Sequence, residues 1–362
     1  MDIETKMNLI KRVGEEIITE EELRSLLETK QRPIAYDGFE PSGLAGIHFG
    51  LYRAINIEDL LKAGIHFKLY LADWFGWINN KMGGDLEKIK QVGKYFIEVW
   101  KASGIDPNKI EIVWTSDVVK ESEYWKKVIL IAKNTTVKRA ERCLTIMGRK
   151  VGELKETAQY FYPMMQTADI FHLKADICQL GLDQRRANML AREVGPKLGW
   201  WKPVVVSHHM LIGLQGVKKP EGFDNNVDID IEISSKMSKS MPETCLYVHD
   251  KKQDIIRKIQ KAYCPEKVVK DNPILEYTKY IIFRKMKILE IKRKKEFGGN
   301  IKIESYNELE KLYKQGKIHP LDLKNSVAET LDILIKPIRE HFEKNKRAKE
   351  LYEIVKRAEI TR

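Results

Sequence analysis

The sequence predicts an α/β protein in which a doubly wound parallel sheet is followed by a helical domain. Strands that alternate with helices through short connections pair in parallel, with helices on both faces of the sheet. The prediction rests on runs that alternate in this way: strand 33–39, helix 49–63, strand 66–72, helix 85–102, strand 110–115 and, further on, strand 175–182, helix 183–197 and strand 203–208. Together they indicate a sheet of the Rossmann type.

The segments that flank or interrupt this alternation are predicted to be helical. Residues 1–32 form an N-terminal helical arm, with Thr19 as a helix cap before three glutamates. Residues 33–245 form the Rossmann-type domain, which carries a helical insertion at about 117–174. The polar connection after Gly213, which leads to Lys236-Met-Ser-Lys-Ser, has no periodicity and is predicted to be a mobile loop. Residues 246–362 form an α-helical domain.

Composition limits the classes of protein that the chain could belong to. Its 362 residues, 43% hydrophobic and 32% charged, suffice for two domains with buried cores. The four cysteines lie far apart without a CxxC pair, which argues against a zinc site or a disulfide framework and fits a reducing cytosol. No uncharged apolar run approaches the ~20 residues of a membrane span. We therefore expect a cytoplasmic protein without a membrane segment or a protein-bound metal.

The net charge of +12 lies entirely in the last third of the chain. Residues 1–250 hold 35 basic and 35 acidic side chains, whereas residues 251–362 hold 29 and 17. A basic module joined to a neutral one favours a polyanion such as nucleic acid as partner. A lysine-rich helical surface can also serve solubility or heat tolerance.

Polar side chains gather in one stretch, 162–186, where a buried helix and strand call for apolar ones. Tyr162, Gln166 and Asp169 are spaced four and three apart and share one helix face. Gln184 follows the strand 175–182, at the sheet edge where open α/β sheets bind ligands. Taken alone, the helix face fits a binding site and a partly exposed amphipathic helix equally well.

A glycine-rich turn, 38–50, joins the first strand to the first helix of the sheet. Unpaired N–H groups and the helix dipole at such a turn favour phosphate. The turn is neither GxGxxG nor a Walker loop. His48 could donate to a phosphate, although a lone histidine there is as often a cap or a packing residue.

These motifs together carry a resemblance to a known family. The run Lys236-Met-Ser-Lys-Ser after the second half of the sheet, with the turn 38–50, resembles the class I aminoacyl-tRNA synthetases. The stretches 34–43 and 162–186 are similar to the tyrosyl-tRNA synthetases of Archaea and eukaryotes. The likeness extends over residues 1–362 and includes Lys261-Ala-Tyr-Cys-Pro, Glu296-Phe-Gly-Gly, His319-Pro-Leu-Asp and the terminal Ile360-Thr-Arg.

The resemblance implies a tyrosine site. Tyr36 and Asp169 match the residues that hydrogen-bond the substrate phenol in similar enzymes. Tyr162, Gln166 and Gln184 match those that hold its α-amino group.

The resemblance also implies an ATP site and two-step chemistry, in which tyrosine is activated to tyrosyl-adenylate with release of pyrophosphate and is then transferred to tRNA(Tyr). The catalytic residues would be His48, Lys236 and Lys239, with Mg²⁺ as counter-ion to the phosphates. Where the family's HxGH signature has a second histidine, this chain has Leu51, whose better interpretation is core packing. The residues that match ATP contacts in the family are Gly38, His48, Gly50, Asp183 and Lys239.

For the basic last third, the resemblance implies an anticodon-binding domain. Phe297 would stack on the first anticodon base, and Asp322 and His319 would read or support it. Arg185 matches a residue near the acceptor end of the tRNA. The family is dimeric, with the inserted helices around 120–150 as the usual interface, so a homodimer is implied.

Three other functions are alternatives to tyrosine activation. Tryptophanyl-tRNA synthetase shares the fold and the lysine motif, but Tyr36 and Asp169 suit a hydroxyl rather than an indole. A non-catalytic RNA-binding protein derived from a synthetase would not need His48, Gln184, Lys236 and Lys239 intact. A generic nucleotidyltransferase would not explain the anticodon-type loops.

Overall fold

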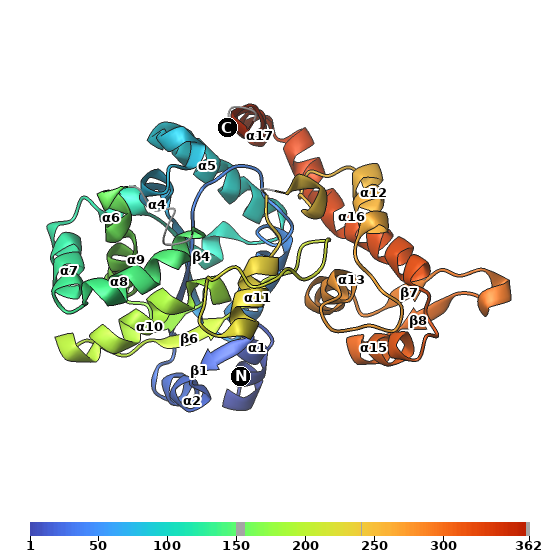
Figure 1. The fold of residues 1–362 in the computed structure, drawn as a ribbon, viewed down its shortest axis with the longest axis horizontal. Coiled ribbons are helices and arrows are strands. Elements are labelled where there is room, and N and C mark those ends of the chain that lie inside the picture. Colours follow the sequence, from blue (N-terminus) through green and yellow to red (C-terminus); the bar gives the residue numbers. More distant parts are fainter. Residues whose placement is uncertain (150–155, 240, 360–362) are drawn as a thin grey trace.

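The core of the protein is a six-stranded sheet with the strand order β1-β6-β5-β2-β3-β4 (Figure 1). The computed structural model describes residues 1–149, 156–239 and 241–359. Neighbouring strands are parallel except for β1 and β6, which are antiparallel. The predicted parallel sheet is confirmed, and its strands are β1 (Glu16–Ile18), β2 (Ile34–Phe39), β3 (His66–Leu71), β4 (Ile110–Trp114), β5 (Ile177–Cys178) and β6 (Val204–Ser207).

The strand order reverses at β2. The chain adds β3 and β4 on one side of β2 and later adds β5 and β6 on the other side. The carboxyl ends of β2 and β5 therefore flank the crevice in which open sheets bind ligands. β5 is shorter than the predicted strand 175–182, because the chain turns away after Gln179 and only one further bridge, Gly181 to His208, continues the pairing.

The N-terminal residues contribute to the sheet as well as forming helices. Helices α1 (Ile3–Lys11) and α2 (Glu20–Thr29) are as expected, and Thr19 caps α2 in a reciprocal capping box with Glu22. Between them, β1 pairs with β6, and the Glu15 N–H donates to the carbonyl of Ser207. The N-terminal arm is therefore not purely helical, because it also contributes an edge strand to the sheet. The three-residue strand escapes sequence reasoning because its hydrogen bonds come from residues about 190 positions away.

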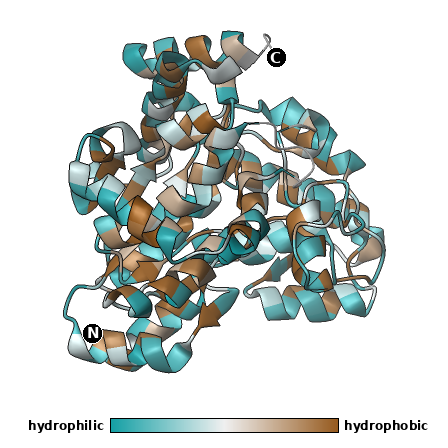
Figure 2. Ribbon diagram, turned by 60° about the vertical axis from the view of Figure 1, so that its left-hand side comes forward, coloured by the Kyte–Doolittle hydropathy of each residue, from teal (hydrophilic) through white to brown (hydrophobic). Residues whose placement is uncertain are grey.

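Helices cover both faces of the sheet and form the insertion. Within the described residues between 117 and 174 there are helices and no strand, as predicted. Figure 2 shows hydrophobic residues gathered on the inward sides of these helices and hydrophilic ones outside. The helices are α3 (Leu51–Lys62), α4 (Asp73–Ile78), α5 (Leu86–Ala102), α6 (Thr115–Val118), α7 (Ser122–Lys133), α8 (Val137–Cys143), α9 (Phe161–His172), α10 (Arg185–Val194) and α11 (Val227–Ser235).

Two of these helices were not predicted. α4 is six residues long and follows β3 directly. α11 lies in the polar connection that was expected to be a loop, where the Asn226 side chain caps its first turn. Its apolar residues, Val227, Ile229, Ile231 and Ile233, alternate with polar ones, and this period of two does not indicate a helix.

The C-terminal part is helical, as expected, with one addition. Its helices are α12 (Lys252–Lys261), α13 (Pro273–Tyr277), a five-residue π-helical turn η9 (Thr278–Ile282), α14 (Phe283–Lys285), α15 (Tyr306–Lys314), α16 (Pro320–Lys344) and α17 (Lys346–Glu359). An unpredicted antiparallel hairpin of β7 (Leu289–Ile291) and β8 (Ile301–Ile303) projects between α14 and α15 (Figure 1). Among the described helices, none is both long and apolar enough to cross a membrane.

The last helix returns to the first part of the chain. α17 lies along α5 (Figure 1), and its buried Ala348, Leu351 and Val355 join the hydrophobic cluster that contains the sheet. The last helix is thus part of the core that supports the sheet, although in sequence it lies within the predicted helical domain, 246–362.

Leu351→Ala should lower the free energy of unfolding by about 2 to 4 kcal/mol, because it removes a side chain that is only 6% exposed from this cluster. Ile354→Ala, on the same helix but 45% exposed, should change it by no more than about 0.5 kcal/mol. Chemical denaturation of both variants measures the difference. Equal losses would show that α17 does not pack on the core as described.

Candidate active site

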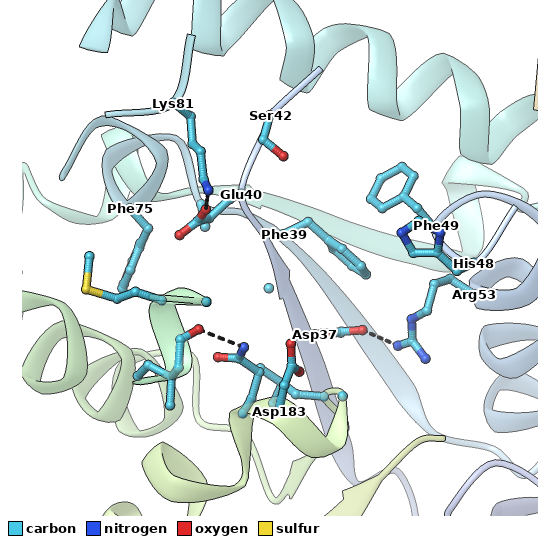
Figure 3. A pocket seen from close by; sticks show the side chains of 18 of the residues that line it. Asp37, Phe39, Glu40, Ser42, His48, Phe49, Arg53, Phe75, Lys81 and Asp183 are labelled. Atoms are coloured by element: carbon cyan, nitrogen blue, oxygen red, sulfur yellow. Dashed lines mark hydrogen bonds and ion pairs between the residues drawn. The ribbon is translucent and has the colours of Figure 1, made fainter. Parts of the chain in front are cut away.

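A cavity of about 750 Å³ opens at the carboxyl ends of the central strands (Figure 3). Lys81 and Glu40 face each other on one side of it, and His48, Phe49 and Arg53 lie on the other. The structure brings ten of the predicted tyrosine, ATP and catalytic residues to its wall: Tyr36, Gly38, His48, Tyr162, Gln166, Asp169, Asp183, Gln184, Lys236 and Lys239. Residues from strands, the insertion and the lysine motif thus line one space.

A buried carboxylate lies within a group of phenols in this cavity. Asp169 in α9 accepts hydrogen bonds on Oδ1 from Tyr70, at 2.8 Å, and from Tyr124, at 2.9 Å. The hydroxyl of Tyr36 is buried and has no hydrogen-bond partner among the described residues. Both Asp169 and Tyr36 line the cavity, where the Tyr36 hydroxyl can still donate and accept, and Asp169 Oδ2 is the oxygen that takes no part in the bonds from Tyr70 and Tyr124.

Burial decides the protonation of Asp169. It raises the pKa of this carboxyl to about 8, although the hydrogen bonds from Tyr70 and Tyr124 pull it down. The same burial raises the pKa of all three phenols well above 10, so they remain donors. Near neutral pH, a new donor to Asp169 would stabilise its charged form.

A second polar group lies on the same face of α9, nearer the N-terminal end of the helix. Tyr162 donates to Glu40 at 2.6 Å, and Gln166 donates to the side-chain oxygen of Gln184 at 3.1 Å. Glu40 also accepts from Asn79, at 3.1 and 3.2 Å. One carboxylate and two neutral amides therefore meet where an ammonium group would find acceptors.

His48 is placed beside the lysine motif. Its Nδ1 lies 3.2 Å from the sulfur of Met237. Burial, with Lys239 and Lys236 nearby, lowers the pKa of His48 to about 3, so the ring is neutral. A neutral imidazole can donate one hydrogen bond to a phosphate oxygen without adding a charge.

The two lysines of the motif have different surroundings. Lys236 Nζ lies 2.6 Å from Asp183 Oδ2, so the predicted ribose acceptor is paired with a predicted phosphate ligand. Lys239 Nζ lies 3.4 Å from the Ser42 hydroxyl, in the glycine-rich turn, and 5.3 Å from the ring centre of Phe96.

Gly50 is the exception among the predicted ATP contacts. It does not line the cavity, and a Cβ there would lie 2.8 Å from a methyl group of Val248 and 3.0 Å from one of Val99. Close packing at the start of α3 therefore requires this glycine. Leu51 is buried in the core, as its side chain predicts.

Several residues around the cavity escaped the sequence reasoning. Tyr70 and Tyr124 hold Asp169 from β3 and α7, and only Tyr70 carried a signal, as a phenol in an apolar strand. In the cavity wall, Arg53 forms a buried ion pair with Asp37 and donates to Gln179 at 2.6 Å. Burial raises the pKa of Asp37 to about 7 against the pull of Arg53. No spacing in the sequence links these residues.

The predicted tRNA residues lie outside the cavity. Phe297 is 63% exposed on the loop of the β7–β8 hairpin, and His319 caps α16, in whose first turn Asp322 lies. The guanidinium of Arg293 donates to the carbonyls of Gly299 and Lys317, both at 2.9 Å, and so joins the two loops. Arg185 pairs with Glu16 in β1 at 2.8 Å.

Among the residues that the structure describes, no group of three or more histidine, cysteine or acidic side chains could hold a metal ion.

Comparisons with known proteins define the class to which this site belongs. A family model described as "tRNA synthetases class I (W and Y)" matches residues 28–336, so the chain belongs to this class of synthetases. It is 46% identical to the tyrosine–tRNA ligase of Sulfurisphaera tokodaii, over 95% of this chain and 94% of that protein. It is 43% identical to the cytoplasmic tyrosine–tRNA ligase 1 of Arabidopsis thaliana, over 100% of this chain and 90% of that protein. Within the class, the chain belongs to the tyrosine–tRNA ligases.

Solved structures of tyrosyl-tRNA synthetases resemble this chain in fold and sequence. Tyrosyl-tRNA synthetase from Pyrococcus horikoshii, complexed with L-tyrosine, superposes with a TM-score of 0.88 and is 41% identical, covering 98% of this chain and 100% of that one. Tryptophanyl-tRNA synthetase from Aeropyrum pernix has a TM-score of 0.68 at 16% identity, with 94% and 84% covered. The latter shares the fold.

The raised pKa of Asp169 predicts a pH-dependent stability. Because the folded carboxyl binds its proton more tightly than an unfolded one, its contribution is complete below about pH 4 and is lost as pH rises towards 8, by roughly 1.4 kcal/mol per pH unit. Asp169→Asn cannot titrate, so the free energy of unfolding of wild type relative to this variant should fall between pH 5 and pH 7. Denaturation at both pH values measures it, and a constant difference would contradict the raised pKa.

Proposed function

We propose that the chain activates L-tyrosine with ATP and transfers it to tRNA(Tyr) through the residues of this cavity. The substrate assignment rests on two polar groups that line the same cavity. One is the buried Asp169 carboxylate, and the other is the Tyr36 hydroxyl, which has no hydrogen-bond partner among the described residues. The substrate phenol would donate to Asp169 Oδ2 and accept from Tyr36. Phenylalanine would leave both groups buried and unpaired.

The α-amino group would lie nearer the N-terminal end of the same face of α9. Tyr162, Gln166 and Gln184 supply oxygens there, and Glu40 supplies a nearby negative charge through its contact with Tyr162. Neutral amides hold an ammonium without adding a fixed charge that would repel the phosphates of ATP.

The nucleotide would occupy the side of the cavity between the glycine-rich turn and the lysine motif. The tyrosine carboxylate is already ionised and attacks the α-phosphorus in line, so that the bond to pyrophosphate breaks without a general base. Positioning and neutralisation of phosphate charge then supply most of the rate. Gly38 has no side chain, so its backbone can lie close to the nucleotide. His48 donates to a phosphate, and Lys236 and Lys239 move onto the β and γ phosphates.

Asp183 would accept from the ribose hydroxyls once Lys236 leaves it for the phosphates. Mg²⁺ would be held by the phosphate oxygens, since the described residues provide no cluster of ligands for it. When bound, it would neutralise charge on the departing pyrophosphate.

The tRNA would be read by the basic C-terminal part. Phe297 offers an exposed ring for stacking on an unpaired base. His319 and Asp322 lie at the start of α16, directly after the loop residue Lys317 to which Arg293 donates. Arg185, beside Gln184, would lie near the acceptor end. This division assigns residues 246–362 to anticodon binding.

The inserted helices support a homodimer. Ile129 in α7 and Val137 in α8 are exposed apolar residues, at 52% and 70%, within the stretch 120–150 that similar enzymes use as an interface. The four free, buried cysteines fit a cytoplasmic protein.

Aminoacylation assays with tyrosine, phenylalanine and tryptophan on matched tRNAs test the substrate. Tyrosine should be preferred over phenylalanine by on the order of 10⁴-fold in kcat/KM, a magnitude already known for tyrosyl-tRNA synthetases and not one that follows from this structure. Preference for tryptophan would favour the rival synthetase. A chain that binds tRNA but charges none of the three would favour a non-catalytic RNA-binding protein.

Lys239→Ala should lower the rate of tyrosine-dependent ATP–pyrophosphate exchange by on the order of 100-fold, because it removes a charge from the phosphates in the transition state. The tyrosine Kd should stay within about twofold. Lys219→Ala, an exposed lysine on the same connection, is the matched control and should leave exchange unchanged. An equal loss of tyrosine binding in Lys239→Ala would exclude a role confined to the phosphates.

Asp322→Ala should raise the KM for tRNA by roughly 10- to 100-fold, because it removes about 1 to 3 kcal/mol of base recognition. Exchange of pyrophosphate, which needs no tRNA, should be unchanged. Asp254→Ala in α12 is a control for the loss of one acidic group from the same part of the chain. A defect in exchange would count against an anticodon role for Asp322.

A further inference from the structure

A buried histidine lies where three parts of the chain meet. His209 follows β6 and is 9% exposed. Its Nδ1 lies 3.0 Å from Glu232 in α11, and its Nε2 lies 3.1 Å from Glu276 in α13. The angles at the ring make both contacts ion pairs rather than aligned hydrogen bonds. His209 thus joins the sheet to the helix before the lysine motif and to the C-terminal helices.

The surroundings of His209 keep it charged. Burial disfavours the imidazolium, but Glu276 and Glu232 outweigh this effect and raise the pKa of His209 to about 10. The ring of Tyr280, from η9, stacks on it with 4.5 Å between centres and 14° between planes. The imidazolium therefore separates two carboxylates that would otherwise repel each other across the boundary between α11 and α13.

The same two carboxylates hold the backbone that follows His209. Glu232 accepts from the N–H of Met210 at 2.9 Å, and Glu276 accepts from the N–H of Ile212 at 3.0 Å. Tyr277 in α13 donates its hydroxyl to the carbonyl of Ile212 at 2.8 Å. The segment 209–213 is thereby fastened to the C-terminal part of the chain.

The opposite side of this segment is paired with the lysine motif. The N–H of Met237 donates to the carbonyl of Leu211 at 2.7 Å, and Ile212 forms an antiparallel bridge with Lys236. The N–H of Gly213 donates to the carbonyl of Ser235 at 3.0 Å. A displacement of α13 therefore reaches Lys236 through two sets of contacts, with His209 at their junction.

We propose that His209 is a positioning residue for tyrosine activation, which couples the place of the C-terminal helices to that of the lysine motif. The inference rests on the proposed function, because it concerns the same lysines. His209 acts through Glu232, Glu276 and the segment 209–213. Through these contacts, a shift of the C-terminal helices that bind tRNA would change the position of the lysines that bind the phosphates.

The test compares His209→Gln, Glu276→Gln and the double variant with wild type in the full-length protein. Each single variant should lower the kcat of tyrosine-dependent ATP–pyrophosphate exchange at least tenfold, with the tyrosine Kd within twofold. The double variant should be no slower than the worse single variant, because residues in one network are not additive.

A matched control separates this coupling from the loss of any buried ion pair. His341 in α16 contacts Glu98 in α5 at 2.9 Å, so it also joins the C-terminal helices to the first part of the chain, but through α5 rather than through the segment 209–213. His341→Gln should leave kcat unchanged.

A second measurement follows the lysine motif directly. Trypsin cleavage after Lys236 or Lys239 should be at least threefold faster in His209→Gln and Glu276→Gln than in wild type and His341→Gln. If His209→Gln does not fold, Glu276→Gln, which keeps an acceptor for Ile212, carries both measurements alone.

The outcomes are distinguishable. Folded variants with the wild-type kcat and cleavage rate would overturn the coupling. Additive losses in the double variant, or an equal loss in His341→Gln, would overturn it as well. A wild type without tyrosine-dependent exchange would overturn the proposed function, and the cleavage rates would still decide whether His209 fixes the lysine motif.

Discussion

The reversal of strand order at β2 is the constraint on which the rest of the site depends. Parallel strands end at one edge of the sheet, and the chain leaves that edge in opposite directions after β2 and after β5. The space between those departures is the cavity. The glycine-rich turn follows the carboxyl end of β2, and the lysine motif pairs with the segment that follows β6. α9 lines the same space with the face that carries Tyr162, Gln166 and Asp169.

Burial in this cavity acts differently on each ionisable group, and the neighbours decide the outcome. Asp169 is surrounded by phenols that donate to it without a full charge, so burial raises its pKa to about 8. His48 has lysines nearby and stays neutral. His209, equally buried, has two carboxylates and stays charged. A low dielectric strengthens both the desolvation cost and the attraction to a partner, so small differences in position reverse the protonation state.

Much of the fold follows from the sequence, and the elements that escaped it share a cause. The strands of the sheet, the insertion and the C-terminal helices have clear periodicity and length. β1, the β7–β8 hairpin, α4 and α11 are short or polar, and they are stabilised by partners that sequence reasoning cannot see, such as Ser207 for the β1 edge. The role of Gly50 could not be predicted for the same reason, because the valines that pack against it, Val99 and Val248, are distant in sequence.

The sequence by itself determined the alternation of strands and helices, the polar face of Tyr162, Gln166 and Asp169, and the motifs that indicate the family. These depend on residue type and spacing, which local chain geometry converts directly into elements. Only the tertiary structure decided which groups satisfy one another. Tyr70 and Asp169 are 99 residues apart, and His209 meets carboxylates from two different helices. Burial and hydrogen-bond partners belong to the folded chain, because folding alone brings distant residues out of water and into contact.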